Sequence, residues 1–423
     1  MKNLIKIIQL MFRSINGFIS ILLISLFVFS GCMSLSAQTD AEYRNRAIDI
    51  LEEVPLIDGH NDVPIQYRSR AGYKLSELDF MNTAELDRPM HTDIPRLREG
   101  RVGGQFWSVY VSANLPESEA VQQTMEQIDF VDRMTEAYPD VFEAALTADD
   151  VERIFRNGKI ASMKGMEGGH SIGNSLATLR KFYDLGARYM TITHGRTLDW
   201  ADSATDAPEN NGLTGFGREV IREMNWLGMI VDLSHVSPKT MKDAIEVSEA
   251  PVIFSHSSAR ALNQHPRNVP DDVLELTRDN GGVVMVTFVP SFISEELREH
   301  LSSRSAYRSK LESLYPGQPD QVDSLMDEWE AEHEAPKATL EQVADHIDHI
   351  TNVAGIDHVG IGGDYDGIGS LPTGLEDVST YPDLFAELLK RGYTDEELKK
   401  IAGLNALRVM RSVEDVSERL RSE

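Results

Sequence analysis

The sequence predicts an α/β fold, a TIM-type (β/α)8 barrel. Eight short apolar runs recur along the 423 residues, and helical patterns separate most of them. Several runs are almost continuously apolar, which is typical of parallel strands buried on both faces. Alternating strands and helices form either a barrel or an open doubly wound sheet, and eight units favour the barrel.

Each expected strand is a short run of mainly apolar residues that leads into a polar or glycine-containing segment. VPLID opens the series and HVGIGGD closes it. By this pattern we expect strands at 54–58, 104–112, 160–167, 187–194, 229–235, 251–256, 282–288 and 358–364.

Helix signals fill several of the intervals between these runs. Thr339 and Gln342 stand at the spacing of a capping box, which marks a helix start. Thr394 and Glu397 repeat this arrangement, and Gly228 ends another pattern as a C-terminal stop. We therefore expect helices over 40–53, 175–186, 217–228, 339–355 and 394–410.

A charged, helix-friendly stretch from about 290 to 338 breaks this rhythm. It separates the seventh expected strand from the eighth by far more than a usual loop. We expect a helical insertion beside the mouth of the barrel, within one domain that spans residues 40–423. Two interpretations of it stay open: a solvated excursion, or a lid or dimer contact.

Residues 1–31 have the charge order of an export signal, because Lys2, Lys6 and Arg13 precede an apolar run over 17–31. Cys32 follows directly, as in a bacterial lipoprotein. We expect export and a membrane anchor through a lipid on Cys32, in the bacterial cell envelope. Ordinary cleavage around 34–38, giving a periplasmic or secreted protein, is the alternative.

The composition is that of a globular protein with a strongly acidic surface. Hydrophobic residues make up 41% and the formal net charge is −27. No cluster of basic and aromatic residues stands out, which argues against a nucleic acid partner. The single cysteine excludes an intrachain disulfide, so stability must come from a large core.

Acid–base and metal-ligand residue types stand at or just beyond the ends of six expected strands. A lone residue of this kind is a weak signal, because histidines and carboxylates are often simple hydrogen-bond partners. Their joint placement is stronger evidence, since all strands of a barrel end on the face where active sites form. These residues are His60 with Asp62, Glu167, His194, His235, His256 and Asp364.

Five of these residues form a candidate ligand set of imidazole and carboxylate without thiolate. Such a set suits Zn²⁺, with Mn²⁺ or Co²⁺ as substitutes. Five ligands are too many for one tetrahedral site but fit two ions that share a carboxylate bridge. Two ions about 3.5 Å apart can hold a hydroxide between them. The set is His60, Asp62, Glu167, His235 and His256, with Glu167 as the natural bridge.

Seven stretches occur in the order LIDGHND, GMEGGHSIG, YMTITH, VDLSHVS, FSHSSAR, HPRNVPDD and GIGGDYDG. Together they resemble the renal (membrane) dipeptidases, the M19 family of metallopeptidases, from about residue 45 to 412. The resemblance implies a barrel of the metal-dependent hydrolase kind that binds two zinc ions, cleaves dipeptides and forms a homodimer. It also divides the ligands: His60 and Asp62 on one ion, His235 and His256 on the other, and Glu167 between them.

Three further residues gain roles from the resemblance. Asp364 is similar to the residue that takes a proton from the bridging water and delivers it to the leaving amine. His194 is similar to the group that hydrogen-bonds the developing oxyanion, and Arg267 to the clamp for the substrate's terminal carboxylate. Carboxylate, neutral imidazole and guanidinium suit these tasks. For Arg267, a surface ion pair with Asp271 or Asp272 is the alternative.

The implied activity is zinc-dependent hydrolysis of L,L-dipeptides and, because the family often tolerates a C-terminal D residue, of L,D-dipeptides. A second hypothesis is opening of a cyclic amide or β-lactam, as in relatives whose metals are bridged by a carboxylated lysine. Lys164 precedes Glu167 by three residues and so faces the other side of the strand. A third hypothesis, a metal-retaining binding protein, is disfavoured by His194, Asp364 and Arg267.

Overall fold

Eight parallel strands close into a barrel in the computed structural model, which describes residues 40–423. Neighbouring strands follow the order β2-β1-β9-β8-β7-β6-β5-β4, and pairing of β2 with β4 closes the ring. This closure confirms the (β/α)8 barrel and excludes the open sheet. The strands are β1 (Leu56–Asn61), β2 (Val102–Tyr110), β4 (Ile160–Glu167), β5 (Ala187–Thr191), β6 (Ile230–Asp232), β7 (Ile253–Phe254), β8 (Val283–Val286) and β9 (Val359–Ile361).

Each predicted strand overlaps an observed one, and β4 has the predicted bounds. β1 runs three residues beyond its predicted end, so His60 lies within the strand. An additional strand, β3 (Phe142–Ala144), was not predicted. It pairs with Ile160–Ser162 at the beginning of β4, outside the ring, and only its first residue is buried. A run this short and exposed has little apolar signal in the sequence.

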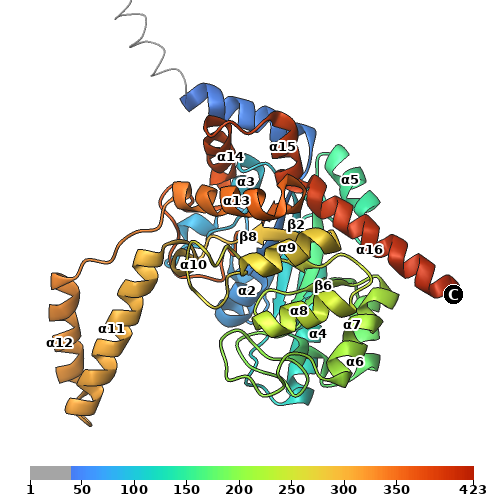
Figure 1. Cartoon of the computed structure of the whole chain (residues 1–423). Coiled ribbons are helices and arrows are strands. Elements are labelled where there is room, and N and C mark those ends of the chain that lie inside the picture. The colour runs from blue at the N-terminus through green and yellow to red at the C-terminus, as the bar shows by residue number, and fades with distance from the viewer. Residues whose placement is uncertain (1–39) are drawn as a thin grey trace, which may run out of the picture.

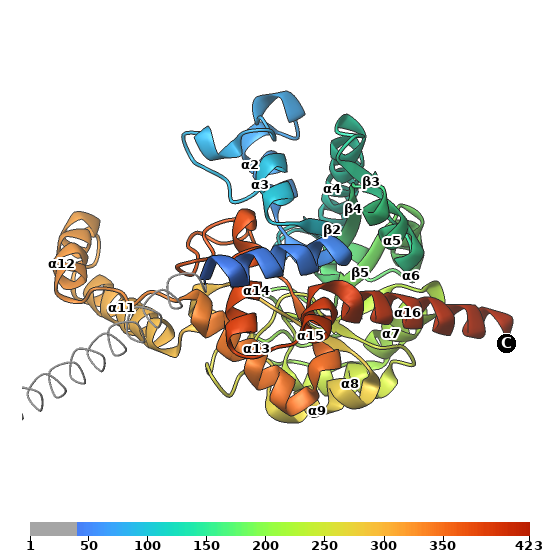
Figure 2. The ribbon, with the colours of Figure 1, turned by 90° about the horizontal axis from the view of Figure 1, so that it is seen from above.

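Helices surround the barrel on its outside (Figures 1 and 2). An N-terminal helix covers residues 40–53. The others around the barrel are α2 (Val63–Ala71), α3 (Ile94–Glu99), α4 (Glu117–Ala137), α5 (Ala148–Arg156), α6 (Leu176–Asp184), α7 (Gly215–Leu227), α8 (Pro238–Val247), α9 (Asp271–Asn280), α13 (Leu340–Ala354), α14 (Tyr381–Lys390), α15 (Asp395–Lys399) and α16 (Asn405–Ser422).

The predicted helix ends are confirmed by their hydrogen bonds. Thr339 and Thr394 each begin a helix with a complete capping box. The chain is helical over the predicted range 394–410, but five π-helical residues, Lys400–Leu404, lie between α15 and α16, and α16 continues to Ser422. In this stretch a side chain at Gly403 would lie 2.1 Å from the carbonyl oxygen of Pro55. The glycine therefore lets the C-terminal helix approach the chain at the start of β1.

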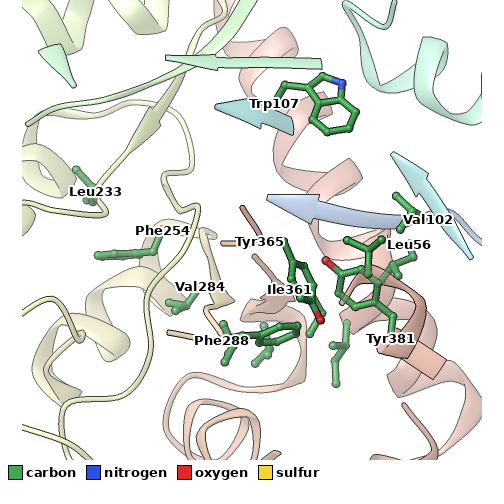
Figure 3. Close-up of a cluster of buried hydrophobic side chains, with 14 of the residues drawn as sticks. Leu56, Val102, Trp107, Leu233, Phe254, Val284, Phe288, Ile361, Tyr365 and Tyr381 are labelled. Atoms are coloured by element: carbon green, nitrogen blue, oxygen red, sulfur yellow. The ribbon is translucent and has the colours of Figure 1, made fainter. Parts of the chain in front are cut away.

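The hydrophobic core has two layers because side chains alternate along each strand. Leu56 and Trp107 belong to the layer between barrel and helices, together with Tyr381 (Figure 3). Their neighbours Ile57 and Phe106 belong to a separate cluster. Both layers are closely packed, so the strand ends that carry the polar residues are held by a rigid scaffold.

Three helices lie between β8 and α13, where the sequence predicts an insertion. They are α10 (Pro290–Ile293), α11 (Glu295–Leu314) and α12 (Pro319–Glu332). α11 and α12 pack on each other through a small cluster of their own and extend away from the barrel (Figures 1 and 2). The expected signal segment 1–31 and Cys32 lie outside the described residues. Between residues 40 and 423, no helix has the length and apolar character needed to cross a membrane.

Candidate active site

The predicted site residues meet at the carboxyl ends of the strands. His60 lies in β1, Glu167 is the last residue of β4, and the others follow the ends of their strands by one to three residues or lie in longer loops. A cavity of about 360 Å³ opens at this end of the barrel. Its lining includes Asp62, Glu167, His194, His235, His256, Arg267 and Asp364. His60 is fully buried.

The carboxylate of Glu167 lies at the centre of the group. Its Oε1 atom is 3.0 Å from Nε2 of His235 and 3.4 Å from Nε2 of His256. Nε2 of His60 lies 3.5 Å away and Nε2 of His194 3.7 Å away. Burial alone would raise the pKa of Glu167, but the surrounding imidazoles hold that pKa well below its usual range. Glu167 is therefore an ionised carboxylate facing four ring nitrogens.

The tautomer of His60 follows from its hydrogen bonds. The hydroxyl of Tyr189 lies 3.0 Å from Nδ1 of His60 and donates to the carbonyl oxygen of Gly59 at 3.1 Å. Because a hydroxyl has one proton to donate, it accepts from Nδ1–H of the imidazole. In the neutral ring Nε2 presents a lone pair, and this buried atom has no hydrogen-bond partner in the described chain. Burial opposes a charge on His60, but Tyr189, Glu167 and Asp62 raise its pKa well above the usual value, so these surroundings favour a cation at Nε2, either a proton or a metal ion.

His256 is oriented in the same way by a different pair of groups. The hydroxyl of Ser255 lies 2.8 Å from Nδ1 of His256 and donates to Oδ2 of Asp232 at 2.7 Å. Nδ1 must therefore carry the proton of His256, which again leaves a lone pair on Nε2. Such outer partners are typical of metal-binding histidines.

These lone pairs and carboxylates fit a metal centre. Several imidazole nitrogens and carboxylate oxygens meet at one point, and there are too few protons between them for each to form a hydrogen bond. Neutral imidazoles and ionised carboxylates are the ligands that divalent cations such as Zn²⁺ prefer. Three groups of potential ligand atoms each lie within 4.8 Å of one another. They are His60, Glu167 and His256; Glu167, His194 and His235; and His60, Asp62 and Asp364. The groups link all five predicted ligands, but they also include His194 and Asp364.

Two site residues have a strained backbone. His235 and Asp364 have φ angles of 69° and 62°, in the left-handed region that residues other than glycine rarely adopt. Such conformations persist where the surrounding structure imposes them, and they cluster at functional sites. Here the turn after each strand directs the side chain back toward Glu167 or Asp62.

Asp364 is buried beside other carboxylates. Burial, together with the charges of Asp62 and Glu167, raises its pKa well above its usual range. A side chain at the adjacent Gly367 would lie 2.5 Å from Oδ1 of Asp364 and 2.2 Å from Oδ2 of Asp62. The glycine thus leaves room for both carboxylates at the cavity. A carboxyl with a raised pKa can both accept and return a proton.

His194 and Arg267 offer donors to the same cavity. Burial lowers the pKa of His194, so its imidazole is neutral and can donate a hydrogen bond. Arg267 is 3% exposed, and burial lowers its pKa to about 10, which leaves it protonated at neutral pH. Its guanidinium makes only two long hydrogen bonds, both 3.4 Å, to Ser257 and to the carbonyl of His256. Most of its donors are therefore free for an anionic group.

The alternative interpretation of Arg267 as a surface ion pair is wrong. Arg267 is buried, whereas Asp271 accepts a hydrogen bond from His349 and Asp272 pairs with Lys242. Lys164 lies on the opposite face of β4 from Glu167, as predicted. Its ammonium pairs with Asp132 and donates to a backbone carbonyl outside the ring, so it does not bridge metal ions.

Sequence reasoning missed the groups that orient the predicted residues. Asp58 accepts hydrogen bonds from the backbone amides of His60 and Gly363 and from the hydroxyl of Tyr381. Ser108 donates to Oε2 of Glu167. Asp58 stands in the motif LIDGHND, two residues before the ligand His60, and this spacing could have indicated its orienting role. The hydroxyl groups of Tyr381 and Ser108 stand at no such spacing in the sequence.

Comparison with known proteins identifies relatives. A family model described as membrane dipeptidase (peptidase family M19) matches residues 44–423. The probable dipeptidase PvdM from Pseudomonas aeruginosa is 27% identical, with 89% of this chain and 99% of that chain covered and a TM-score of 0.76. A metallo peptidase of family M19, dipeptidase AC, is 26% identical, with 85% and 98% covered and a TM-score of 0.70. A metallo peptidase from Rhodobacter sphaeroides, liganded with a phosphinate mimic of the dipeptide L-Ala-D-Ala, is 24% identical, with 85% and 99% covered and a TM-score of 0.70, and shares the fold.

Proposed function

This chain belongs to peptidase family M19, the membrane dipeptidases, and is a metallo-dipeptidase; from this premise we propose that it hydrolyses L,L- and L,D-dipeptides with two zinc ions. The single observation that carries the metal proposal is the convergence of oriented imidazoles on Glu167. Nε2 of His60 and Nε2 of His256 each present a lone pair there when the rings are neutral, because their Nδ1–H groups donate to the hydroxyls of Tyr189 and Ser255.

The ligands of the proposed ions are His60, Asp62, Glu167, His235 and His256. Zinc bound there would supply positive charge that makes a water molecule nucleophilic near neutral pH. The protein must then bind the dipeptide, direct its carbonyl and move a proton. These tasks fall to side chains that line the cavity on the solvent side of the ligands.

Arg267 binds the C-terminal carboxylate of the dipeptide in this proposal. A planar guanidinium can hold a carboxylate through two parallel hydrogen bonds. A longer peptide would carry its C-terminal carboxylate away from Arg267 and would lose this contact. His194 donates to the carbonyl oxygen as negative charge develops on it. Asp364 accepts the proton of the attacking water and returns it to the leaving amine.

Hydrolysis of a small substrate panel tests this function. Purified protein is assayed with Gly-Leu, L-Ala-L-Ala, L-Ala-D-Ala and L-Ala-L-Ala-L-Ala, before and after chelation and after addition of Zn²⁺, Mn²⁺ or Co²⁺. The L,D substrate is included because a relative of the same fold was solved with a mimic of that dipeptide. We expect cleavage of dipeptides only, lost on chelation and best restored by Zn²⁺. Equal cleavage of the tripeptide would contradict the role of Arg267.

Measured metal content tests the number of ions independently of activity. Two zinc ions per chain support the dinuclear proposal, and one ion per chain refutes it. Two bound ions without cleavage of any dipeptide would favour the second hypothesis, hydrolysis of cyclic amides or β-lactams. Lys164 does not support this hypothesis, because its ammonium is engaged away from the site.

Export, lipidation and dimerisation are further proposals. Export and the anchor rest on the sequence of residues 1–32 alone. A Cys32→Ser variant should move from the membrane fraction to the soluble fraction and lose labelling by fatty acid. Dimerisation rests on the family resemblance, and sedimentation equilibrium of the purified chain tests it. A monomer at micromolar concentration would refute it.

A further inference from the structure

A second cavity, of about 500 Å³, lies at the opposite end of the barrel from the catalytic residues. It is bounded by the first residues of β2 and β4, by the end of α5 and by the end of the N-terminal helix. Because the strands are parallel, their starting ends face away from the metal ligands. This volume is within the range of small-molecule sites. Nothing in the dipeptidase reaction uses this end of the barrel.

The floor of this cavity is apolar. Leu51, Val102, Val141 and Ile160 line it and are buried hydrophobic residues of the core. Phe155 adds a partly exposed aromatic ring at the end of α5. An apolar group placed here would remove both its own surface and this floor from water, which favours binding.

The rim of the cavity is cationic, in contrast to the rest of the chain. The whole sequence has 68 acidic and 41 basic side chains. The cavity reverses this ratio, since four cationic side chains and two carboxylates line it. The cations are Arg98, Arg101, Arg156 and Lys159, and the carboxylates are Glu52 and Glu53.

Carboxylates neutralise only part of the rim among residues 40–423. Glu52 pairs with Arg101 at 3.2 Å, and Lys159 pairs with Glu143 at 3.3 Å. Glu53 is engaged with Lys399 at 2.6 Å. The Nε atom of Arg101 is buried without a hydrogen-bond partner, and its residue has a left-handed φ of 61°. A buried donor without a partner is costly, and an acceptor bound beside Arg101 would satisfy it.

Two other guanidinium groups of the rim, unlike Arg101, have no carboxylate partner within residues 40–423. Within that range Arg98 donates to the backbone carbonyl of Asp140 alone, at 3.4 Å. Arg156 has no ion pair with any residue in the described range 40–423. Guanidinium groups present paired N–H donors that match phosphate and carboxylate oxygens. The rim therefore offers several donors to one anionic group above an apolar floor.

We propose that this cavity, which we call the basal cavity, binds an amphiphilic anion. The phosphate or carboxylate head lies among Arg98, Arg101 and Arg156, and the apolar body lies on the floor beside Phe155. The head could belong to a soluble organic anion or to an anionic lipid of a membrane surface, since both present the same chemistry. Binding here is independent of dipeptide hydrolysis at the other end of the barrel.

Titration calorimetry with three probes tests this site in the full chain. Octyl phosphate below its micelle concentration carries both the head and the apolar body, inorganic phosphate carries only the head, and octanol carries only the body. We expect saturable 1:1 binding of octyl phosphate and at least about tenfold weaker binding of each partial probe. Equal affinity for inorganic phosphate would overturn the role of the floor.

Matched variants assign the binding to the basal cavity. The pair Arg98→Ala and Arg156→Ala should weaken octyl phosphate binding by about tenfold or more, because charge-assisted hydrogen bonds are lost. Phe155→Ala should weaken octyl phosphate but not inorganic phosphate. Lys337→Ala, which removes an exposed cation elsewhere, should have no effect. Unchanged dipeptide hydrolysis in each variant shows that the fold is intact.

A binding experiment with lipid vesicles distinguishes a membrane lipid from a soluble organic anion as the ligand. Sedimentation with phosphatidylcholine vesicles, with and without phosphatidylglycerol, is compared between the unmodified chain and the double arginine variant. Phosphatidylglycerol-dependent binding that the variant loses, without binding of soluble octyl phosphate, assigns the site to a membrane lipid. Binding of octyl phosphate alone assigns it to a soluble anion. If the double variant matches the unmodified chain in both assays, the proposal is wrong.

Discussion

The Nε2 atoms of His235 and His256 lie 2.9 Å apart, and both face Oε1 of Glu167. His256 presents a lone pair to this point because its Nδ1–H donates to the hydroxyl of Ser255. Without a cation, a proton on Nε2 of His235 fills the gap, and burial holds the pKa of His235 well below its usual value, so that ring is neutral. A cation bound here would take both nitrogens and the carboxylate as ligands, and the proton of His235 would then have to reside on Nδ1.

Tyr189→Phe should weaken metal binding about 10- to 100-fold, because His60 loses the acceptor that fixes its tautomer. Turnover at saturating Zn²⁺ should change much less, since the phenol does not line the cavity. Competition with a chromophoric chelator measures the affinity. Tyr73→Phe is the matched control, because the hydroxyl of Tyr73 is buried without a described hydrogen-bond partner. Equal affinities of the two variants would contradict the tautomer argument.

Asp364→Asn should retain both metal ions and lose about 10²- to 10⁴-fold in kcat, because the amide cannot carry the proton. Asparagine tolerates the left-handed backbone at this position, where φ is 62°. Atomic absorption and steady-state kinetics on the same preparation separate the two effects. Loss of zinc would show that Asp364 is a ligand, as its grouping with His60 and Asp62 permits.

Asp366→Asn provides the control for Asp364→Asn. Asp366 has a similar φ, 66°, is buried, and accepts a hydrogen bond from the backbone amide of His91. An asparagine oxygen can accept the same bond. We therefore expect a far smaller loss of kcat, and equal losses in the two variants would mean that Asp364 acts through the fold of the loop.

Much of the site could be predicted because its ligands occupy the same position in successive strand–helix units, at the carboxyl end of the strand. His60, Glu167 and His256 each stand near the carboxyl end of a buried strand, and a parallel barrel brings these ends together. The apolar runs that define the strands are local features of the sequence. Ligand convergence then follows from topology alone, without knowledge of any side-chain contact.

The orienting groups could not be predicted for a physical reason. Tyr189 contacts His60 from a strand 129 residues away, and a tyrosine inside a barrel has no sequence signal beyond its apolar ring. Asp232 ends β6 and Ser255 follows β7, but neither stands at the spacing of a known ligand motif. Burial of Arg267 likewise depends on α10, whose Phe292 ring lies 5.4 Å from the guanidinium.

Arg267→Lys should lower kcat/KM for dipeptides about 10²-fold, mainly through KM, because an ammonium cannot form the paired hydrogen bonds of a guanidinium. Dipeptides with a C-terminal amide should be poor substrates for both enzymes, with similar kcat/KM. The ratio of acid to amide kcat/KM is the measurement. Arg260→Lys, in the same loop but bound to the carbonyl of Pro266, should keep the ratio of the unmodified enzyme. An unchanged ratio in Arg267→Lys would place the carboxylate elsewhere.

His346 should make stability depend on pH. Its Nδ1 accepts from the amide of Ala259 and its Nε2–H donates to the carbonyl of Ile293, each at 3.0 Å, so the buried ring is neutral. Burial lowers its pKa to about 4, against about 6.5 in an unfolded chain. Between these values only the unfolded chain binds the proton, so stability is complete above about pH 6.5 and falls as pH falls toward 4.

His346→Asn removes this contribution, because asparagine can accept from Ala259 but does not titrate. At pH 5 the unmodified chain should have lost about 2 kcal/mol of stability through His346, from 1.36 kcal/mol per pKa unit. Urea unfolding at pH 7.5 and pH 5 measures this loss in both proteins. The variant should be less stable at pH 7.5 but should lose about 2 kcal/mol less on acidification. All other histidines are shared, so their contributions cancel in this comparison, and equal losses would show that His346 is not neutral in the folded protein.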